Sequence, residues 1–473
     1  MLDLLIRDGT IVDGQGSMRG SIAVAGSRIV ARYAEDAELP AAREVIDAGD
    51  RLVFPGLIDP HVHFYGEGIG EYSQLAVRGG VTTFIGMIRG APEEPLADVV
   101  AAHHSEGAAA SVADFSFHVV LYDRDEALAQ VAEIAAQGFR SFKMFLAYKR
   151  RGMMVGERFL IAAMDEIVRV GGIALIHSED GEVIDRLEQG ALAEGRSAPG
   201  DYEPTRPAET EAAAIEIVAL CSQATNCPAY IVHLSSSAGL AAIERARHRG
   251  VPLWIESCPQ YILMDNETLC RHGAGAKIAP PLRTPADRRA LETALKSGVI
   301  NTMGSDHASH SLPAKEEGQD NIFAAPFGMP GAPTLWPSMF TWAVDHEVPL
   351  PTLVRAMSEM PARLFGLAHR KGTLLPGADA DIILVDPTAR QTVDAELFWP
   401  TVSPSPLVGE SLGGWPDLTI SRGEVVWRDG ALTASAGRGE LIRQYGADRG
   451  RRQRAVGAGV RGADLDRLQG RGA

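Results

Sequence analysis

The stretch PGLIDPHVHF, from Pro55 to Phe64, ends an apolar run with two histidines, His61 and His63, that stand two residues apart. Side chains at positions i and i+2 of a β-strand point to the same face, so both imidazoles would project together at the carboxyl end of this strand. This arrangement favours chelation of a metal ion. The alternative is a turn residue beside a satisfied core histidine, and the rest of the chain has to separate the two interpretations.

Short apolar runs continue after this stretch and alternate with Ala-, Glu- and Leu-rich segments of helical period. Including the first, the runs are LVFPGLIDPHVHF, TTFIGMI, DFSFHVVL, SFKMFLA, GIALIHSE, AYIVHLSS, PLWIESCP and INTMGSDHA. Strands that alternate with helices indicate a parallel sheet of the α/β class, and eight such units predict a TIM-type (β/α)8 barrel.

The two ends of the chain differ from this pattern. Residues 1–51 hold short β-like runs broken by turns, and such runs return after a helical segment near Pro361–Leu367. We expect one small β-sandwich domain built from residues 1–51 and 371–436, around a metal-dependent barrel at 52–370. Residues 437–473 carry nine arginines and four acids among glycines and alanines, and we expect a flexible tail or an oligomer contact there.

The bulk composition narrows the partners. The chain has 473 residues, 45% hydrophobic and 22% charged, with a net charge of −16, which argues against a nucleic-acid or anionic-membrane surface and favours a small molecule. Four cysteines are too few for a disulfide framework, so we expect a reduced, cytoplasmic protein. No signal-type stretch opens the sequence, and no apolar run approaches the roughly 20 residues that span a bilayer.

Polar residues interrupt the apolar runs where the strands of a barrel would end. Active-site residues of TIM barrels lie at these carboxyl ends. Each such residue alone has a structural alternative, but their coincidence at one face favours a metal site, with Zn²⁺ preferred and Mn²⁺, Co²⁺ or Fe²⁺ as alternatives. The candidate residues are His61, His63, Lys143, His177, His233 and Asp306.

Lys143 is the unusual member of this set, because it lies in the apolar run SFKMFLA. A buried ammonium is costly, so the pKa of this lysine should fall and its neutral amine should become reactive. A neutral amine can add CO2 to form a carbamate, whose two oxygens can bridge two metal ions. The alternative is a lysine that reaches solvent or pairs with a carboxylate.

Eight motifs carry a family resemblance: PGLIDPHVHF, GGVTTF, SFKMFLAYK, ALIHSE, YIVHLSS, ESCPQY, PPLR and GSDHA. Together they resemble the amidohydrolase superfamily, and within it the cyclic-amidohydrolase branch of dihydropyrimidinases (hydantoinases), allantoinases and dihydroorotases. The resemblance covers nearly the whole chain, from IRDGTIVDG to KGTLLPGADADIILVDP. It implies a metal-dependent hydrolase that opens a cyclic amide at its C–N bond, in a homodimer or homotetramer.

The resemblance also implies roles for single residues. Lys143 would be an N6-carboxylysine that bridges two divalent metals, one bound by His61, His63 and Asp306 and the other by His177 and His233. Asp306 would move the proton from the attacking water to the departing nitrogen. Tyr148 would donate a hydrogen bond to the developing oxyanion, and its alternative is a loop aromatic that packs at the barrel mouth.

Four positions depart from the patterns of these families and bear on the substrate. Ala279 in KIAPPLR and Phe327 in APFGMPGAP stand where dihydropyrimidinases have serine and asparagine, so we expect a more apolar pocket. Arg89 in GMIRGAP replaces an asparagine and could bind a substrate carboxylate; its alternative is an ion pair with Glu93 or Glu94. Tyr65 stands where dihydroorotases place an arginine, which disfavours that activity.

Other functions are weighed against this one. Allantoinase or cyclic imide hydrolase activity is the alternative within the same branch. A non-catalytic dihydropyrimidinase-related protein is disfavoured by the complete ligand set, and deaminases or exocyclic N-acyl hydrolases by the presence of Lys143.

Overall fold

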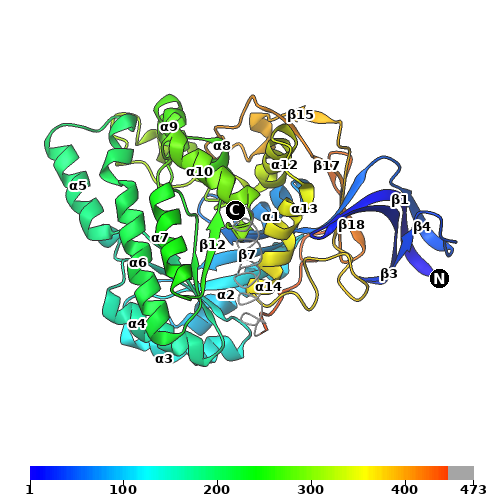
Figure 1. Cartoon of the computed structure of the whole chain (residues 1–473), viewed down its shortest axis with the longest axis horizontal. Coiled ribbons are helices and arrows are strands. Elements are labelled where there is room, and N and C mark those ends of the chain that lie inside the picture. Colours follow the sequence, from blue (N-terminus) through cyan, green and yellow to red (C-terminus); the bar gives the residue numbers. More distant parts are fainter. Residues whose placement is uncertain (446–473) are drawn as a thin grey trace, which may run out of the picture.

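The computed structural model describes residues 1–445 and contains an eight-stranded parallel sheet rolled into a barrel (Figure 1). Neighbouring strands are hydrogen-bonded in chain order. Val62 and His307 form a parallel bridge between the first and last strand regions, where the His63 amide donates to the His307 carbonyl at 2.8 Å. The predicted TIM-type barrel is therefore confirmed, and its strands are β6 (Leu57–Val62), β7 (Val81–Ile88), β8 (Asp114–Val120), β9 (Ser141–Phe145), β10 (Ile173–His177), β11 (Ala229–Ile231), β12 (Leu253–Ser257) and β13 (Thr302–Met303).

Amphipathic helices cover the barrel. In α4 the buried residues recur with helical spacing, from Phe159 and Leu160 through Ala163 and Met164 to Ile167. The helices are α1 (Ile69–Arg78), α2 (Leu96–Ala110), α3 (Asp125–Ala136), α4 (Glu157–Arg169), α5 (Gly181–Ala193), α6 (Ala208–Thr225), α7 (Ser237–His248), α8 (Pro259–Leu263), α9 (Asn266–His272), α10 (Pro285–Lys296), α11 (Leu312–Glu316), α12 (Leu335–Asp345), α13 (Leu350–Val354) and α14 (Met360–Leu364).

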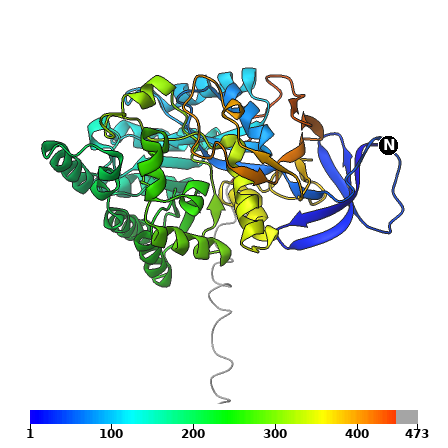
Figure 2. The same ribbon diagram turned by 90° about the horizontal axis from the view of Figure 1, so that it is seen from above.

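Strands from both ends of the chain join in a second, nine-stranded sheet, as expected for the flanking domain. This sheet lies at the end of the molecule opposite α5 and α6 (Figures 1 and 2). Its strands are β1 (Leu2–Asp13), β2 (Gly16–Ala25), β3 (Arg28–Ala34), β4 (Ala42–Asp47), β5 (Leu52–Pro55), β14 (Ile382–Val385), β17 (Pro416–Ser421), β18 (Glu424–Arg428) and β19 (Ala431–Leu432). A separate pair is formed by β15 (Arg390–Thr392) and β16 (Ser411–Gly413).

The apolar run 52–64 is divided between the two sheets at Gly56. β5 pairs with β1 and β14 of the flanking sheet, whereas β6 begins the barrel. A Cβ atom at Gly56 would lie 2.2 Å from the Thr82 Oγ1 atom, so only glycine fits where the chain passes from one sheet to the other. This passage fixes the position of the strand that carries His61.

A buried charge cluster joins the flanking sheet to the barrel. The Lys371 Nζ atom lies 2.5 Å from Asp114 at the start of β8, 2.9 Å from Asp379 and 2.7 Å from Asp381. All four side chains are buried. Because one cation contacts three carboxylates, this cluster of Lys371, Asp114, Asp379 and Asp381 acts as an internal ion-pair network rather than as an open ligand set.

The segment expected to be a tail begins in contact with the barrel. The Phe115 amide donates to the Glu440 carbonyl at 2.9 Å, and Ile442 and Gln444 are buried. The expectation of a flexible tail or oligomer contact otherwise concerns residues 446–473, which lie outside the described part of the chain. Among residues 1–445, no helix has both the length and the apolar character needed to cross a membrane.

Candidate metal and substrate site

The six candidate ligands come together at the carboxyl ends of the barrel strands. His61 and His63 lie at the end of β6, Lys143 in β9 and His177 at the end of β10. The loops that follow β11 and β13 supply the last two, His233 and Asp306. All of them except the fully buried His61 line one cavity of about 200 Å³.

His61, His63 and Asp306 form the first group of converging atoms. The Nε2 atoms of the two histidines lie 3.2 Å apart. The Asp306 Oδ1 atom lies 3.2 Å from the His61 Nε2 atom and 3.5 Å from the His63 Nε2 atom. Burial raises the pKa of the Asp306 carboxyl, but the two imidazoles outweigh it and hold this pKa below its usual value. Two ring nitrogens and a carboxylate oxygen aimed at one point are a suitable ligand set for a divalent metal.

His177 and His233 form the second group. The His177 Nδ1 atom lies 2.9 Å from the His233 Nε2 atom, and both side chains are buried. Burial lowers the pKa of both imidazoles, which favours their neutral forms, and neutral imidazole is the form that binds metals.

Lys143 lies between these groups without a polar partner. Its side chain is fully buried, and its Nζ atom has no hydrogen bond or ion pair within the described residues. The alternatives of a lysine that reaches solvent or pairs with a carboxylate therefore do not apply. Burial lowers the pKa of this amine to about 8, with Glu256 and Asp306 opposing the shift. An orphaned buried amine between two converging histidine groups fits a site for two divalent metals bridged by a lysine carbamate.

Carboxylates behind the ligands orient the imidazoles. Glu256 on β12 accepts from the His61 Nδ1 atom at 2.6 Å, from the His233 amide at 3.0 Å and from the Tyr230 hydroxyl at 2.8 Å. Such partners fix the tautomer and raise the basicity of the ligating nitrogen. The sequence analysis missed Glu256, although its place as an acid inside the apolar run PLWIESCP was an available signal.

Glu179 has the equivalent role for His177. Its Oε2 atom lies 2.7 Å from the His177 Nε2 atom, and its Oε1 atom accepts from the Arg206 Nε atom at 3.1 Å. Burial raises the pKa of the Glu179 carboxyl, but Arg206 and His177 outweigh it and hold this pKa well below its usual range. The carboxylate stays charged, and the His177 Nδ1 atom is left to face the site. Sequence reasoning missed this residue too, although it stands two positions after His177.

Three site residues have backbone conformations that are rare outside glycine. The φ angles are 67° at Tyr148, 40° at His233 and 46° at Asp306. Backbone strain of this kind persists where surrounding contacts impose it, and it is concentrated at functional sites. The chain thus turns sharply after β9, β11 and β13 and aims these side chains back over the barrel mouth.

Tyr148 and the three expected substrate residues line the same cavity. The Tyr148 hydroxyl lies 3.4 Å from the His177 Nδ1 atom, so it is directed at the second histidine group. Arg89, Ala279 and Phe327 line the cavity together with Tyr65, Arg151, Met153 and His310. The sequence did not single out Arg151 or Met153.

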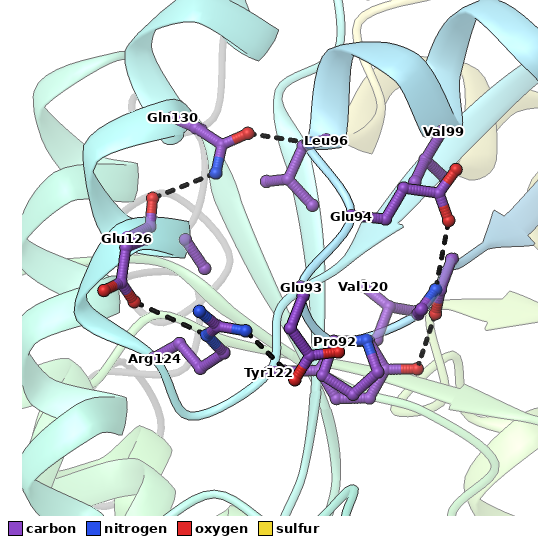
Figure 3. A pocket seen from close by; sticks show the side chains of 13 residues that line it. Pro92, Glu93, Glu94, Leu96, Val99, Val120, Tyr122, Arg124, Glu126 and Gln130 are labelled. Carbon is purple, nitrogen blue, oxygen red and sulfur yellow. Dashed lines mark hydrogen bonds and ion pairs between the residues drawn. The ribbon is translucent and has the colours of Figure 1, made fainter.

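The acids expected as alternative partners of Arg89 are engaged elsewhere. Glu93 lies 3.2 Å from Arg124, which also contacts Glu126, and Glu94 accepts from the Ala91 amide at 3.1 Å (Figure 3). These residues surround a separate small pocket beside the loop after β7. The Arg89 guanidinium instead lies 5.6 Å from the centre of the Tyr65 ring.

A barrel mouth with two histidine groups and acid partners behind them is suited to holding divalent metal ions at the usual active-site end of such barrels. The amidohydrolase family profile matches residues 52–426 of this chain. The chain therefore belongs to the amidohydrolase family of enzymes, and the resemblance to its cyclic-amidohydrolase branch is confirmed.

The similar proteins match over almost their whole lengths. A D-hydantoinase of Ralstonia pickettii is 30% identical, with 94% of this chain and 99% of the relative aligned. A D-hydantoinase of Geobacillus stearothermophilus is 32% identical over 94% of this chain and 97% of the relative. Among solved structures, the dihydropyrimidinase from Brevibacillus agri has a TM-score of 0.90 at 30% identity and covers 95% of this chain and 100% of its own.

Proposed function

We propose that this protein is a binuclear metal-dependent hydrolase that opens a cyclic amide at its ring C–N bond, as hydantoinases and dihydropyrimidinases do. Water adds its oxygen to the ring carbonyl carbon, the C–N bond breaks, and the departing nitrogen takes up a proton. The product is an open chain with a new carboxylate and an N–H group. The buried, unpartnered Lys143 amine between the two histidine groups is the observation that carries this proposal.

In this proposal one divalent ion would be held by His61, His63 and Asp306, and the other by His177 and His233. The Lys143 amine, once carboxylated by CO2, would supply oxygen ligands to both ions. Zn²⁺ is the preferred ion for such nitrogen and oxygen ligands, and Mn²⁺, Co²⁺ and Fe²⁺ are alternatives. When bound, the metal pair supplies an activated water and polarises the attacked carbonyl.

The protein's own residues then move the proton and stabilise charge. Asp306, which its lowered pKa keeps as a carboxylate, is the group placed to accept the proton of the water and to return it to the departing nitrogen. Tyr148 donates a hydrogen bond to the oxygen on which negative charge develops. Ala279 and Phe327 form apolar parts of the cavity wall and exclude water around the ring.

The test is initial-rate hydrolysis by protein expressed with Zn²⁺ or Mn²⁺ and bicarbonate. The substrates are dihydrouracil, 5-substituted hydantoins, allantoin, dihydroorotate and cyclic imides. We expect the protein to hydrolyse a ring ureide or imide and to bind two metal ions per chain. Lys143→Ala should lose both the activity and the metal ions. The control is Lys149→Ala, an exposed lysine paired with Glu182. Absence of turnover over the whole panel with two metals bound would refute the proposal, and the native mass tests the expected homodimer or homotetramer.

A further inference from the structure

The rim of the active-site cavity is positively charged although the protein as a whole is acidic. Two arginines, Arg89 and Arg151, line the cavity, and among the described lining residues Asp306 is the only acid. Asp306 is already engaged by His61 and His63. In a chain with a net charge of −16 this local excess of positive charge runs against the overall balance.

Arg89 is fixed but not neutralised. It follows β7 at the cavity mouth, and its guanidinium lies over the Tyr65 ring. Within residues 1–445 it forms no ion pair, because the acids of its own loop bind Arg124 and a backbone amide instead (Figure 3). The Tyr65 and Tyr122 hydroxyls also contact this guanidinium. Neutral partners and a cation–π contact orient a guanidinium and leave its positive charge without an opposite charge.

Arg151 is the second arginine that lines this cavity without an ion pair. It ends the short 3-10 helix η1 (Lys149–Arg151), which follows the sharp turn at Tyr148. Its neighbours Lys149 and Arg150 pair with Glu182 and Asp185, whereas Arg151 has no carboxylate partner in the described part of the chain. Its guanidinium lies 4.6 Å from the centre of the Phe327 ring.

We propose, building on the hydrolase function above, that Arg89 and Arg151 bind a carboxylate on the ring substituent of the substrate. The preferred substrate is then an acidic cyclic amide such as a carboxyalkyl hydantoin. Planar guanidiniums are suited to paired hydrogen bonds with a carboxylate. The apolar Phe327 and Ala279 also line this cavity and offer contacts for the ring. A cavity of about 200 Å³ suits one ring with a short substituent.

The experiment compares two substrates of nearly identical shape, 5-(carboxymethyl)hydantoin and its neutral amide 5-(carbamoylmethyl)hydantoin. The measured quantity is the ratio of kcat/KM for the acid to that for the amide, with the metal-loaded enzyme. We expect a ratio of at least about a hundred, since each of the two arginines should contribute about tenfold or more. Arg89→Gln and Arg151→Gln should each lower it about tenfold to a hundredfold, which is the effect of losing a hydrogen bond to a charged group. Arg150→Gln, whose arginine pairs with Asp185, should keep the ratio.

The outcomes separate this inference from the function on which it rests. Equal turnover of the acid and the amide, or a ratio that neither arginine variant changes, overturns carboxylate recognition and leaves ring hydrolysis standing. If no ring is hydrolysed, the proposed function fails, and calorimetric titration of both compounds into the protein decides the inference by itself. Tighter binding of the acid that is lost in both variants supports it, and equal affinity for the two compounds refutes it.

Discussion

Replacing Lys371 by methionine should strongly destabilise the protein without touching the active site. The variant removes the cation of the buried cluster at the seam between the flanking sheet and the barrel. Asp379 keeps Arg28 at 2.8 Å and Arg370 at 2.9 Å, and Asp114 keeps Arg422 at 3.1 Å. Asp381 loses its one ion-pair partner among the described residues and keeps only the Arg422 amide, at 2.8 Å.

The expected loss of stability follows from this one carboxylate, Asp381, that is left without a cation. Leaving one buried carboxylate without its cation costs about 3–5 kcal/mol of unfolding free energy. Burial already raises the pKa of Asp381, and loss of Lys371 raises it further. A carboxyl whose folded pKa is above its unfolded value favours folding only while it is protonated. The deficit of the variant should therefore be full at pH 7 and shrink as the pH falls towards 5.

The assay is urea unfolding of the wild type and the variant at pH 7 and pH 5, followed by circular dichroism. Lys149→Met is the matched control, because it removes a lysine from an exposed ion pair with Glu182 and should leave the free energy of unfolding nearly unchanged. Asp381→Asn added to Lys371→Met should restore most of the lost stability. A loss below 1 kcal/mol, or a deficit that is the same at both pH values, would refute the argument.

Three further changes test the site and the division of the first strand. Glu179→Gln should weaken metal binding by about 10- to 100-fold, because it removes the carboxylate that orients His177. Competition with a chelator measures the metal affinity, and an unchanged affinity would contradict this prediction. Tyr148→Phe should lower kcat about 10²- to 10³-fold with metal content and unfolding midpoint unchanged, and an equal fall in bound metal would instead indicate a ligand-positioning role. Gly56→Ala should lower the free energy of unfolding by about 1–3 kcal/mol, because the new Cβ atom would clash with Thr82. If the variant unfolds thermally at the same midpoint as the wild type, the chain can shift at this position and the prediction is wrong.

The sequence predicted the barrel and the gathering of the candidate ligands at its mouth because both depend on local order. A strand that ends in a polar residue places that residue at the barrel mouth whatever its neighbours are, so His177 and Asp306 could be assigned one strand at a time. The boundary inside residues 52–64 could not be predicted in this way, because β5 and β6 form one apolar run in the sequence. Their separation follows only from pairing with β1 and β14, which are distant in sequence.

The partners behind the ligands were missed for a related reason. Glu256 contacts His61 across 195 positions of sequence, and only the closure of the barrel shows which ligand an acid on β12 will meet. Arg151 stands in the basic run KRR, where any of the three residues could have been the one left unpaired. The left-handed turn at Tyr148 and the acids Glu182 and Asp185 select it, and neither is visible in the run itself.

The candidate ligands with their acid partners and the residues expected to contact the substrate have separate roles in the site. The ligands and the acids behind them lie at strand ends, where barrel closure and buried ion pairs hold them rigidly. Arg89, Arg151 and Phe327 lie outside the barrel strands, in the segments that follow them. The contacts of these side chains are with aromatic rings, and other side chains could replace them without changing the strands. Chemistry that needs fixed geometry is thus built into the sheet, whereas recognition of the substrate is built into loops that can change without disturbing it. Arg89 and Phe327, which depart from the pattern that the family resemblance implies, lie on these loops, and we therefore expect them to change which ring is opened rather than how it is opened.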